Sequence, residues 1–199
     1  MDTAWYTQTL VDRGVSTMWL RPSRAIKPDE DMGEYLFIKN EFIQTSTIVL
    51  TRELAQKIPF DPSLRKGQDL DFCLRLHHAG VRFKMLSNPL SIWSDKTEVG
   101  RTSHISGYKP VLDWLNKAEP YLTKRAAKGY KATVLAYYLA PSKKLTALRL
   151  ILSAWLTAGV PTKIASRQVL RCIVPRDKYR ALVNAFIRIR NKDSTKGRD

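Results

Sequence analysis

The chain has 199 residues, of which 44% are hydrophobic and 26% are charged. These proportions match those of soluble globular proteins and exclude a disordered or collagen-like chain, and the length allows one domain with an extension. The net charge of +16 is placed unevenly, because residues 1–108 hold 14 Lys/Arg against 13 Asp/Glu, and residues 109–199 hold 20 against 5. This asymmetry predicts an anionic partner for the second half, either lipid headgroups or nucleic acid.

The first part of the chain alternates between strand-like and helix-like segments. Residues 1–20 alternate loosely between polar and apolar side chains and predict one or two short strands. Residues 21–31 contain two prolines and no apolar period, which predicts a surface loop. The segment 34–43 then shows an amphipathic pattern of side chains. The β-branched run 45–50 predicts a buried strand, and 51–58 predicts a helix that a threonine caps and a proline follows.

The clearest helix of the first half begins after a loop over 60–67 that contains a proline and a glycine. From Asp69 onward apolar side chains recur at helical spacing until Gly80 supplies a stop. Residues 81–85 then alternate between apolar and basic side chains, which predicts a half-buried strand before Asn88-Pro89. This order of elements predicts α/β packing.

Beyond Pro110 the sequence predicts helices separated by Pro120, Pro141, Pro161 and Pro175. The most apolar stretch, 145–160, contains Arg149 and is shorter than the roughly 20 residues that span a bilayer. We therefore expect a packed or interfacial amphipathic helix there.

Two cysteines, Cys73 and Cys172, lie far apart in helix-like segments and offer neither a metal-ligand spacing nor a disulfide framework. Residues 1–10 show no basic segment followed by an apolar one, so we expect no secretory signal. Both features predict that the chain stays in the reducing cytosol.

Asp69 and Asp71 stand in the first turn of the predicted helix, where backbone N–H groups stabilise negative charge. We expect at least one of the two to be ionised at neutral pH, and a fixed, ionised carboxylate at a loop–helix junction can act as a general base toward a hydroxyl. The alternative is structural: Asp69 caps the helix, and Asp71 pairs with Arg75 one turn later.

The segment Gln44–Trp93 resembles the second half of a family 2 glycosyltransferase domain of the GT-A fold. In that family a strand and a short helix lead through a Pro-Phe-Asp turn to an acidic pair, a helix that ends in glycine, a strand and a proline-containing segment. The corresponding residues here are Ile58-Pro59-Phe60-Asp61, Gln68-Asp69-Leu70-Asp71, Leu74-Arg75-Leu76, Gly80 and Asn88-Pro89-Leu90.

The similarity extends from about Val11 to Ser103 and is strongest to bacterial exopolysaccharide-type members. It implies an α/β fold in which 1–107 form the C-terminal, acceptor-side half of a GT-A domain and 108–199 form a basic helical extension. The nucleotide-binding half that precedes this region in family members has no counterpart in the sequence, so we expect a partial domain whose activity alone is in question.

The resemblance also implies an inverting sugar transfer from a nucleotide-sugar donor to a lipid-linked or polysaccharide acceptor. Asp69 occupies the position of the catalytic base that removes the proton of the acceptor hydroxyl. Gln68 would orient that base or bind acceptor, and Asp71 is a second substrate-side candidate that more plausibly braces the helix. Arg101 and Ser103 match the Arg-x-Ser that often closes the domain.

Family members hold a divalent metal, Mg²⁺ or Mn²⁺, with an Asp-x-Asp motif in the half that is missing here. Asp29-Glu30-Asp31 fits that pattern literally, but it follows Lys27-Pro28 in a loop and comes too late in the chain. We expect it to be a solvated acidic turn. His104 is a weak candidate for a metal ligand, since some GT-A enzymes use a late histidine.

The tail combines basic side chains with an apolar face, and this composition suits an anionic membrane surface. The residues are Lys143, Lys144, Arg149, Lys163, Arg167 and Arg171, together with Trp155. A peripheral position at the inner face of the plasma membrane follows. The alternative is a helical extension packed on the domain with its charges in solvent.

Two other functions remain open from the sequence. The tail could bind nucleic acid, although nothing beyond its charge favours this. The chain could also be a non-catalytic remnant or accessory subunit that keeps the fold without the donor site.

Overall fold

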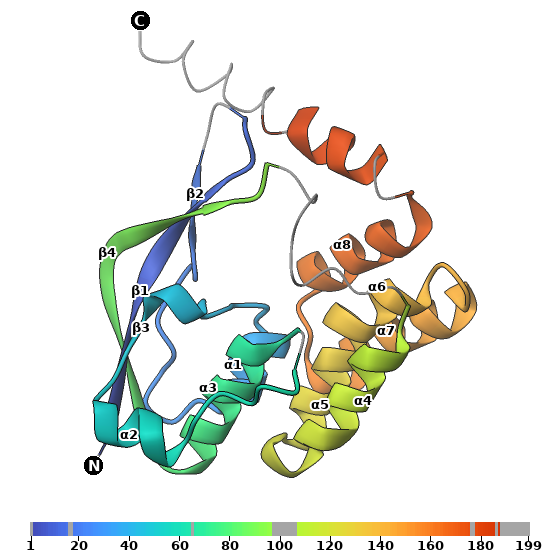
Figure 1. Ribbon diagram of the computed structural model, residues 1–199. Coiled ribbons are helices and arrows are strands. Elements are labelled where there is room, and N and C mark those ends of the chain that lie inside the picture. The colour runs from blue at the N-terminus through green and yellow to red at the C-terminus, as the bar shows by residue number, and fades with distance from the viewer. Residues whose placement is uncertain are drawn as a thin grey trace, which may run out of the picture.

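The computed structural model describes residues 2–15, 18–64, 66–96, 107–175, 178–185 and 187. Figure 1 shows a small twisted sheet with helices beside it and a second group of helices farther from the sheet. We call the described residues 2–96 the sheet half and 107–175 the helical half. The architecture is therefore mixed α/β with a helical extension, as the sequence predicts.

The sheet half contains four strands and three short or medium helices. In chain order these are β1 (Thr3–Asp12), β2 (Trp19–Arg21), α1 (Met32–Phe37), the 3₁₀ turn η1 (Thr45–Thr47), β3 (Ile48–Val49), α2 (Arg52–Lys57), α3 (Gln68–His78) and β4 (Arg82–Ser94). The helical half contains α4 (Lys109–Ala118), the 3₁₀ turn η2 (Glu119–Tyr121), α5 (Lys124–Tyr130), the π-helical η3 (Lys131–Leu135), α6 (Ala136–Leu139), α7 (Lys144–Ala158) and α8 (Thr162–Ile173).

Strand β1 is the centre of the sheet. It pairs in parallel with β4 on one side and antiparallel with β2 and β3 on the other. The N-terminal segment is thus a ten-residue strand and not the short one that its weak alternation predicts. Most of β1 is buried on both faces, and a strand of that kind loses the polar–apolar alternation that marks a half-exposed strand.

Strand β4 is longer than predicted because it continues through Asn88-Pro89. Thr7 pairs with Leu86, Gln8 with Pro89 and Thr9 with Ser91, so β4 carries extra residues around the proline. Proline has no N–H to donate to a ladder, and it is tolerated in strands at edges and bulges. The side chains of Thr9 and Ser91 are hydrogen-bonded on the far side of this bulge, at 2.8 Å.

The prediction of a buried strand over 45–50 is wrong. Residues Thr45–Thr47 form the turn η1, and only Ile48–Val49 pair with β1. The carbonyl of Gln44 accepts hydrogen bonds from the backbone N–H of Thr47 at 2.9 Å and from its hydroxyl at 2.7 Å. Threonine hydroxyls offer the backbone this local alternative to a ladder, which the β-branched pattern alone does not reveal.

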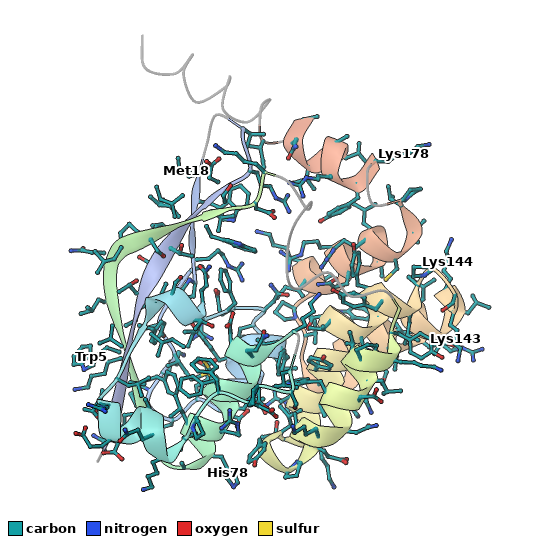
Figure 2. All side chains as sticks on the ribbon, viewed as in Figure 1. Trp5, Met18, His78, Lys143, Lys144 and Lys178 are labelled. Atoms are coloured by element: carbon teal, nitrogen blue, oxygen red, sulfur yellow. The ribbon has the colours of Figure 1, made fainter. Side chains whose placement is uncertain are left out.

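One face of the sheet carries the helices and the other is open over its first half. Ala4 and Phe83 pack with Leu54 of α2 and Phe72 of α3. On the opposite face Trp5, Val49 and Leu86 are 40%, 63% and 45% exposed, and the ammonium of Lys84 lies over the Trp5 ring. Figure 2 shows Trp5 at the edge of the molecule, on the side away from the helical half. Sheets with parallel strands are normally covered on both faces, so this face is an apolar surface without a cover among the described residues.

The helical half packs on the sheet half through α1 and α5. A Cβ added to Gly129 of α5 would lie 2.7 Å from Ile38 and 3.0 Å from the backbone of Phe37. A Cβ added to Gly33 of α1 would likewise lie 2.9 Å from the Cβ of Ala126 in α5. Because these positions lack side chains, the two helices approach closely and one hydrophobic core runs from Tyr6 into α8.

The predicted helix boundaries of the second half are confirmed. Pro120 lies in η2, Pro141 follows α6, Pro161 precedes α8, and Pro175 follows α8. Helix α2 is also capped as predicted, since the Thr51 hydroxyl accepts from the N–H of Leu54. Both cysteines are buried, free thiols on α3 and α8.

Candidate functional site

The candidate site is built on the first turn of α3. Gly67, with φ +77°, occupies the position before the helix and directs the chain into it. A left-handed backbone of this kind favours glycine. The helix then presents Gln68, Asp69 and Asp71 in its first turn, where unpaired N–H groups and the helix dipole favour negative charge. The alternative in which Asp69 is the N-cap is wrong, because Gly67 holds that position.

Asp69 is half-buried and is held by a residue distant in sequence. Its Oδ1 accepts a hydrogen bond from the Thr45 hydroxyl of η1. Burial raises the pKa of the Asp69 carboxyl above its usual value, and the contact with Thr45 opposes part of this rise. Desolvation therefore outweighs the effect of hydrogen bonding on this carboxyl, and a raised pKa makes its ionised form a stronger base.

Asp71 has a different environment only two residues away. Its side chain is buried, and Oδ2 accepts a hydrogen bond from Nε of Arg75 at 2.7 Å. This is the i, i+4 pair that the sequence predicts, and it occupies the carboxylate within the helix itself. The geometry favours the bracing role for Asp71 over contact with a substrate.

Gln68 binds the preceding loop. Its amide nitrogen donates to the carbonyl of Leu64 at 2.7 Å, and the side chain is half-buried. The residue thus stabilises the loop that leads to Asp69, and its role toward the base or the acceptor stays a prediction.

Three neighbours of this turn were not identified from the sequence. Thr45 lies 24 positions before Asp69. The ammonium of Lys66 contacts the hydroxyl of Tyr138 and lies 4.4 Å from the centroid of its ring. Nε1 of Trp114 is buried without a hydrogen-bond partner among the described residues, 3.9 Å from the position of a Cβ on Gly67. No spacing rule could have found these contacts, because they join the site to η1, α6 and α4.

The acidic turn Asp29-Glu30-Asp31 has structural roles. Glu30 forms an ion pair with Arg24 at 2.5 Å. Asp31 caps α1 by accepting from the N–H of Glu34 at 2.9 Å, and its other oxygen lies 3.8 Å from Nε2 of His77. The expectation of a solvated turn is therefore corrected for Glu30 and Asp31, which are engaged within the protein.

Within the described part of the chain, no group of three or more His, Cys, Asp or Glu side chains could hold a metal ion. Arg101, Ser103 and His104, the other residues predicted from the resemblance, lie outside the described residues.

The basic residues of the tail fall into two groups. Five are exposed: Lys143, Lys144 and Arg149 on or next to α7, and Lys163 and Arg167 on α8. Figure 2 shows Lys143 and Lys144 at the outer edge of the helical half. Arg171 of α8 instead lies over the ring of Tyr137, 4.4 Å from its centroid, and donates to Gln168. No helix among the described residues is long and apolar enough to cross a membrane.

Helix α7 carries one buried and one exposed apolar face. The buried face consists of Ala147, Ile151, Ala154 and Ala158. On the other face Leu145, Leu152 and Leu156 are 73%, 52% and 66% exposed, with Arg149 between them and Trp155 beside them. We call Leu145, Arg149, Leu152, Trp155 and Leu156 the outer face of α7.

Comparison with known proteins finds a similarity to a glycosyltransferase. Over 127 residues the chain is 37% identical to the amylovoran biosynthesis glycosyltransferase AmsB of Erwinia amylovora. The match covers 64% of this chain and 42% of AmsB, so the chain spans less than half the length of the curated relative it matches. No family model and no solved structure matches the chain. Over the matched region the chain is glycosyltransferase-like.

Proposed function

We propose that this chain supplies the acceptor-side half of an inverting family 2 glycosyltransferase of the GT-A fold. The donor is a nucleotide sugar, and the acceptor is a lipid-linked or polysaccharide hydroxyl. The observation that carries the proposal is Asp69: a half-buried carboxylate with a raised pKa at a helix start, within a segment whose motifs follow the family order. The similarity to AmsB supports a transferase of this kind.

In the proposed reaction Asp69 takes the proton of the acceptor hydroxyl. The acceptor oxygen forms a bond to the anomeric carbon as the bond from that carbon to the diphosphate breaks, and configuration inverts. Because Thr45 occupies Oδ1, the second oxygen, Oδ2, is the one that meets the acceptor. General-base assistance of this kind contributes about 10²–10⁴-fold to a rate.

The open face of the sheet supports a second element of the proposal. Trp5, Val49 and Leu86 form an apolar surface that the described helices leave exposed. We infer that the donor-binding half of the domain packs against this face. Its carboxylates would hold the divalent metal that neutralises the diphosphate, and no step assigned to the present residues passes through that metal.

Substitution of Asp69 by Asn tests the base. The variant should be assayed for sugar transfer in membranes of cells that supply this chain together with the donor half, which is sought in the reading frame immediately upstream. Asn keeps the shape and accepts from Thr45 but cannot take a proton, so we expect transfer to fall by about 10²-fold or more with unchanged folding.

The matched control is Asp113→Asn, which removes one exposed carboxylate from α4. We expect it to retain transfer within about twofold, since exposed substitutions away from the site have small effects. Undiminished transfer by the Asp69→Asn protein would remove Asp69 as the base. If even the unsubstituted protein transfers no sugar from any nucleotide sugar, the remnant alternative is favoured.

We propose further that the outer face of α7 lies on an anionic membrane. Three exposed leucines and Trp155 surround Arg149, and Lys143 and Lys144 stand at the start of the helix, so that apolar insertion is combined with attraction to acidic headgroups. The excess of basic residues over 109–199 favours the same partner. An enzyme with a lipid-linked acceptor would then work at the surface that holds it.

Sedimentation with vesicles tests this position. We expect the full chain to bind phosphatidylglycerol vesicles, and the triple change Leu145→Ser, Leu152→Ser and Leu156→Ser to weaken binding by about tenfold or more, because each inserted leucine contributes 1 kcal/mol or more. The control replaces three exposed apolar residues of β4, Leu86, Leu90 and Ile92, by serine.

Equal losses in the two triple variants would show that the outer face of α7 is not the membrane contact. Tighter binding to random DNA than to the vesicles, with a steep dependence on salt, would favour the nucleic-acid alternative.

A further inference from the structure

The loop that leads into α3 is held by side chains of the helical half. We call its described residues, 60–64, 66 and 67, the entry loop. The backbone closes a turn there through the N–H of Leu64, which donates to the carbonyl of Asp61 at 3.3 Å. Segments outside helices and sheets open at a low cost in free energy unless other contacts hold them. The conformation of the entry loop therefore depends strongly on its side-chain contacts.

An ion pair joins the first part of the entry loop to α4. Oδ2 of Asp61 accepts a hydrogen bond from the ammonium of Lys117. Oδ1 of Asp61 accepts from the N–H of Ser63 at 2.9 Å and from its hydroxyl at 2.6 Å, and the Lys117 ammonium donates to that hydroxyl at 3.4 Å. The bond from Lys117, followed by those from Ser63, holds the pKa of the Asp61 carboxyl well below its usual value, so this carboxylate is ionised at neutral pH.

Two aromatic residues of the helical half contact the last part of the entry loop. The ammonium of Lys66 contacts the hydroxyl of Tyr138 in α6 and lies 4.4 Å from the centroid of its ring. Trp114 of α4 is 5% exposed, and its Nε1 lies 3.9 Å from the position of a Cβ on Gly67. Both ends of the entry loop are thus held by the helical half.

The entry loop is in turn bonded to the first turn of α3. The amide nitrogen of Gln68 donates to the carbonyl of Leu64 at 2.7 Å. The N–H of Asp71 donates to the carbonyl of Gly67 at 2.9 Å. A displacement of the loop would therefore displace the turn that carries Asp69, and water would reach the half-buried carboxyl of Asp69 more easily.

We propose that Lys117 and Tyr138 are positioning residues for Asp69, so that the helical half fixes the place and the desolvation of the carboxyl that acts in transfer. Position matters because a displacement of about 1 Å at a reacting group can cost about 10²-fold in rate. That the positioned carboxyl is a base rests on the proposed function; the hold of the helical half on the entry loop does not.

The alternative is that the entry loop is fixed by its own bonds, such as Asp61–Ser63 and Gln68–Leu64. The contact of Lys117 would then be an ordinary surface ion pair, since its side chain is 53% exposed and exposed pairs contribute little singly. In the proposed arrangement two contacts from different helices hold one loop. Removing both should therefore have a larger effect on Asp69 than removing either.

Conservative substitutions remove the two contacts without emptying a buried position. Lys117→Gln removes the ion pair with Asp61. Tyr138→Phe removes the hydroxyl contact and keeps the ring that lies under the ammonium of Lys66. Lys117→Arg restores a cation and should restore the ion pair. We expect all three proteins, and the double variant Lys117→Gln/Tyr138→Phe, to fold.

Matched controls make the same chemical changes at positions with no hydrogen bond to the entry loop among the described residues. Lys109→Gln removes an exposed charge from the start of α4. Tyr108→Phe removes a hydroxyl from a ring whose centroid lies 5.0 Å from the ammonium of Lys143. We expect both controls to behave like the unsubstituted chain in every measurement below.

Carboxyl NMR titration of Asp69 tests the positioning without any transfer assay. The full chain is labelled with ¹³C at the aspartate carboxyls, and Asp69→Asn assigns the signal. Burial outweighs the contact with Thr45 in setting the Asp69 pKa, so easier access of water should lower that pKa toward 3.8 in Lys117→Gln and Tyr138→Phe, and further in the double variant. The buried thiol of Cys73, one turn later, stays neutral because burial and the Asp69 charge raise its pKa. A merely structural loss of global stability would leave the pKa of the folded protein unchanged.

Hydrogen exchange supplies a second measurement on the same proteins. Amides of 60–69 should exchange about threefold faster in each single variant, which is the effect of losing one exposed contact, and faster still in the double variant. Amides of β4 should exchange at an unchanged rate. An unchanged Asp69 pKa together with unchanged exchange of 60–69 in the double variant would overturn the positioning role, whether or not Asp69 is a base.

Sugar transfer, assayed together with the donor half, then connects the positioning with catalysis. The double variant should lower kcat by about tenfold and change KM by about twofold or less, because the base is misplaced while the groups that bind substrate remain. Lys117→Arg should retain kcat within about twofold. Full transfer by the double variant despite a shifted Asp69 pKa would overturn the contribution to catalysis. Full transfer by Asp69→Asn would instead remove the proposed base, and the NMR and exchange results would still decide whether the helical half positions this carboxyl.

Discussion

The sheet half and the helical half bury side chains of different size. Around β1, α1 and α3 the core consists of large residues such as Tyr6, Tyr35, Phe37, Phe72 and Leu74. In the helical half large residues such as Trp114 and Tyr130 are buried too, but alanine is the commonest buried residue of the helices: Ala118, Ala126, Ala132, Ala136, Ala147, Ala154, Ala158 and Ala165. Small residues allow helices to approach closely, whereas large ones fill the wider space between a sheet and its helices.

The difference explains where the large apolar residues of α7 lie. Alanines occupy most of the buried face of α7, and Leu145, Leu152 and Leu156 are exposed on its other face, whereas Leu74 and Leu76 of α3 are buried. An apolar residue in a helix is therefore a poor guide to the core of this protein unless its face is known. It also means that the same substitution should have opposite consequences in the two helices.

The largest expected effect comes from Leu74→Ala in α3. Leu74 is 1% exposed, and its truncation should lower the free energy of unfolding by about 2–5 kcal/mol through lost burial and the cavity left behind. Leu152→Ala in α7 should change it by about 0.5 kcal/mol or less, because that side chain is already in solvent. Urea denaturation of the two variants measures the contrast. Comparable losses would show that the outer face of α7 is covered in solution.

A smaller effect is expected from Gly129→Ala, at the contact between the halves. The added methyl would meet Ile38 at 2.7 Å and the Phe37 backbone at 3.0 Å, so α5 and α1 would have to separate. Overpacking of this kind costs about 1–3 kcal/mol, against which the better helix propensity of alanine returns at most about 1 kcal/mol. The net result should be a lower unfolding midpoint.

Lys124→Ala, on the exposed side of the same helix, serves as the control and should leave the midpoint nearly unchanged. A Gly129→Ala protein as stable as the unsubstituted chain would show that the halves are packed less closely than the alanine-rich core indicates.

Local signals made part of this structure predictable. Helix α3 could be predicted because its apolar spacing, first-turn acids and terminal Gly80 agree, and the helices after residue 109 because prolines separate them. The pair Asp71–Arg75 follows from i, i+4 spacing. Such features depend on neighbours within one or two turns, and the sequence shows those neighbours directly.

The remaining features depend on contacts between distant segments. The turn at Thr45 replaces a strand because its hydroxyl-rich residues bond locally, and the same turn brings Thr45 to Asp69. Lys66 and Tyr138 are in contact although they lie 72 positions apart. No periodicity in the sequence indicates these long-range contacts. The sequence therefore locates the site at Asp69 but does not identify the other residues that surround it.

The smallest expected effect separates two forces on Asp69, the helix dipole and burial. Burial raises its pKa above the usual 3.8, so the folded state holds a proton that the unfolded state has already lost as the pH rises. The unsubstituted chain therefore loses stability relative to Asp69→Asn between pH 3.8 and the folded pKa, and the deficit stays constant above that.

Denaturation of both proteins from pH 3 to pH 7 measures the difference between their free energies of unfolding. Because both proteins contain the ion-paired carboxylates of Asp12 and Glu30, whose pKa values are lowered, the contributions of these two groups cancel in the difference. Asp113→Asn controls for the loss of one surface charge. An Asp69→Asn protein less stable than the unsubstituted chain at pH 7 would show that the first turn of α3 stabilises the charge more than burial opposes it. In that case Asp69 would be a weaker base than proposed.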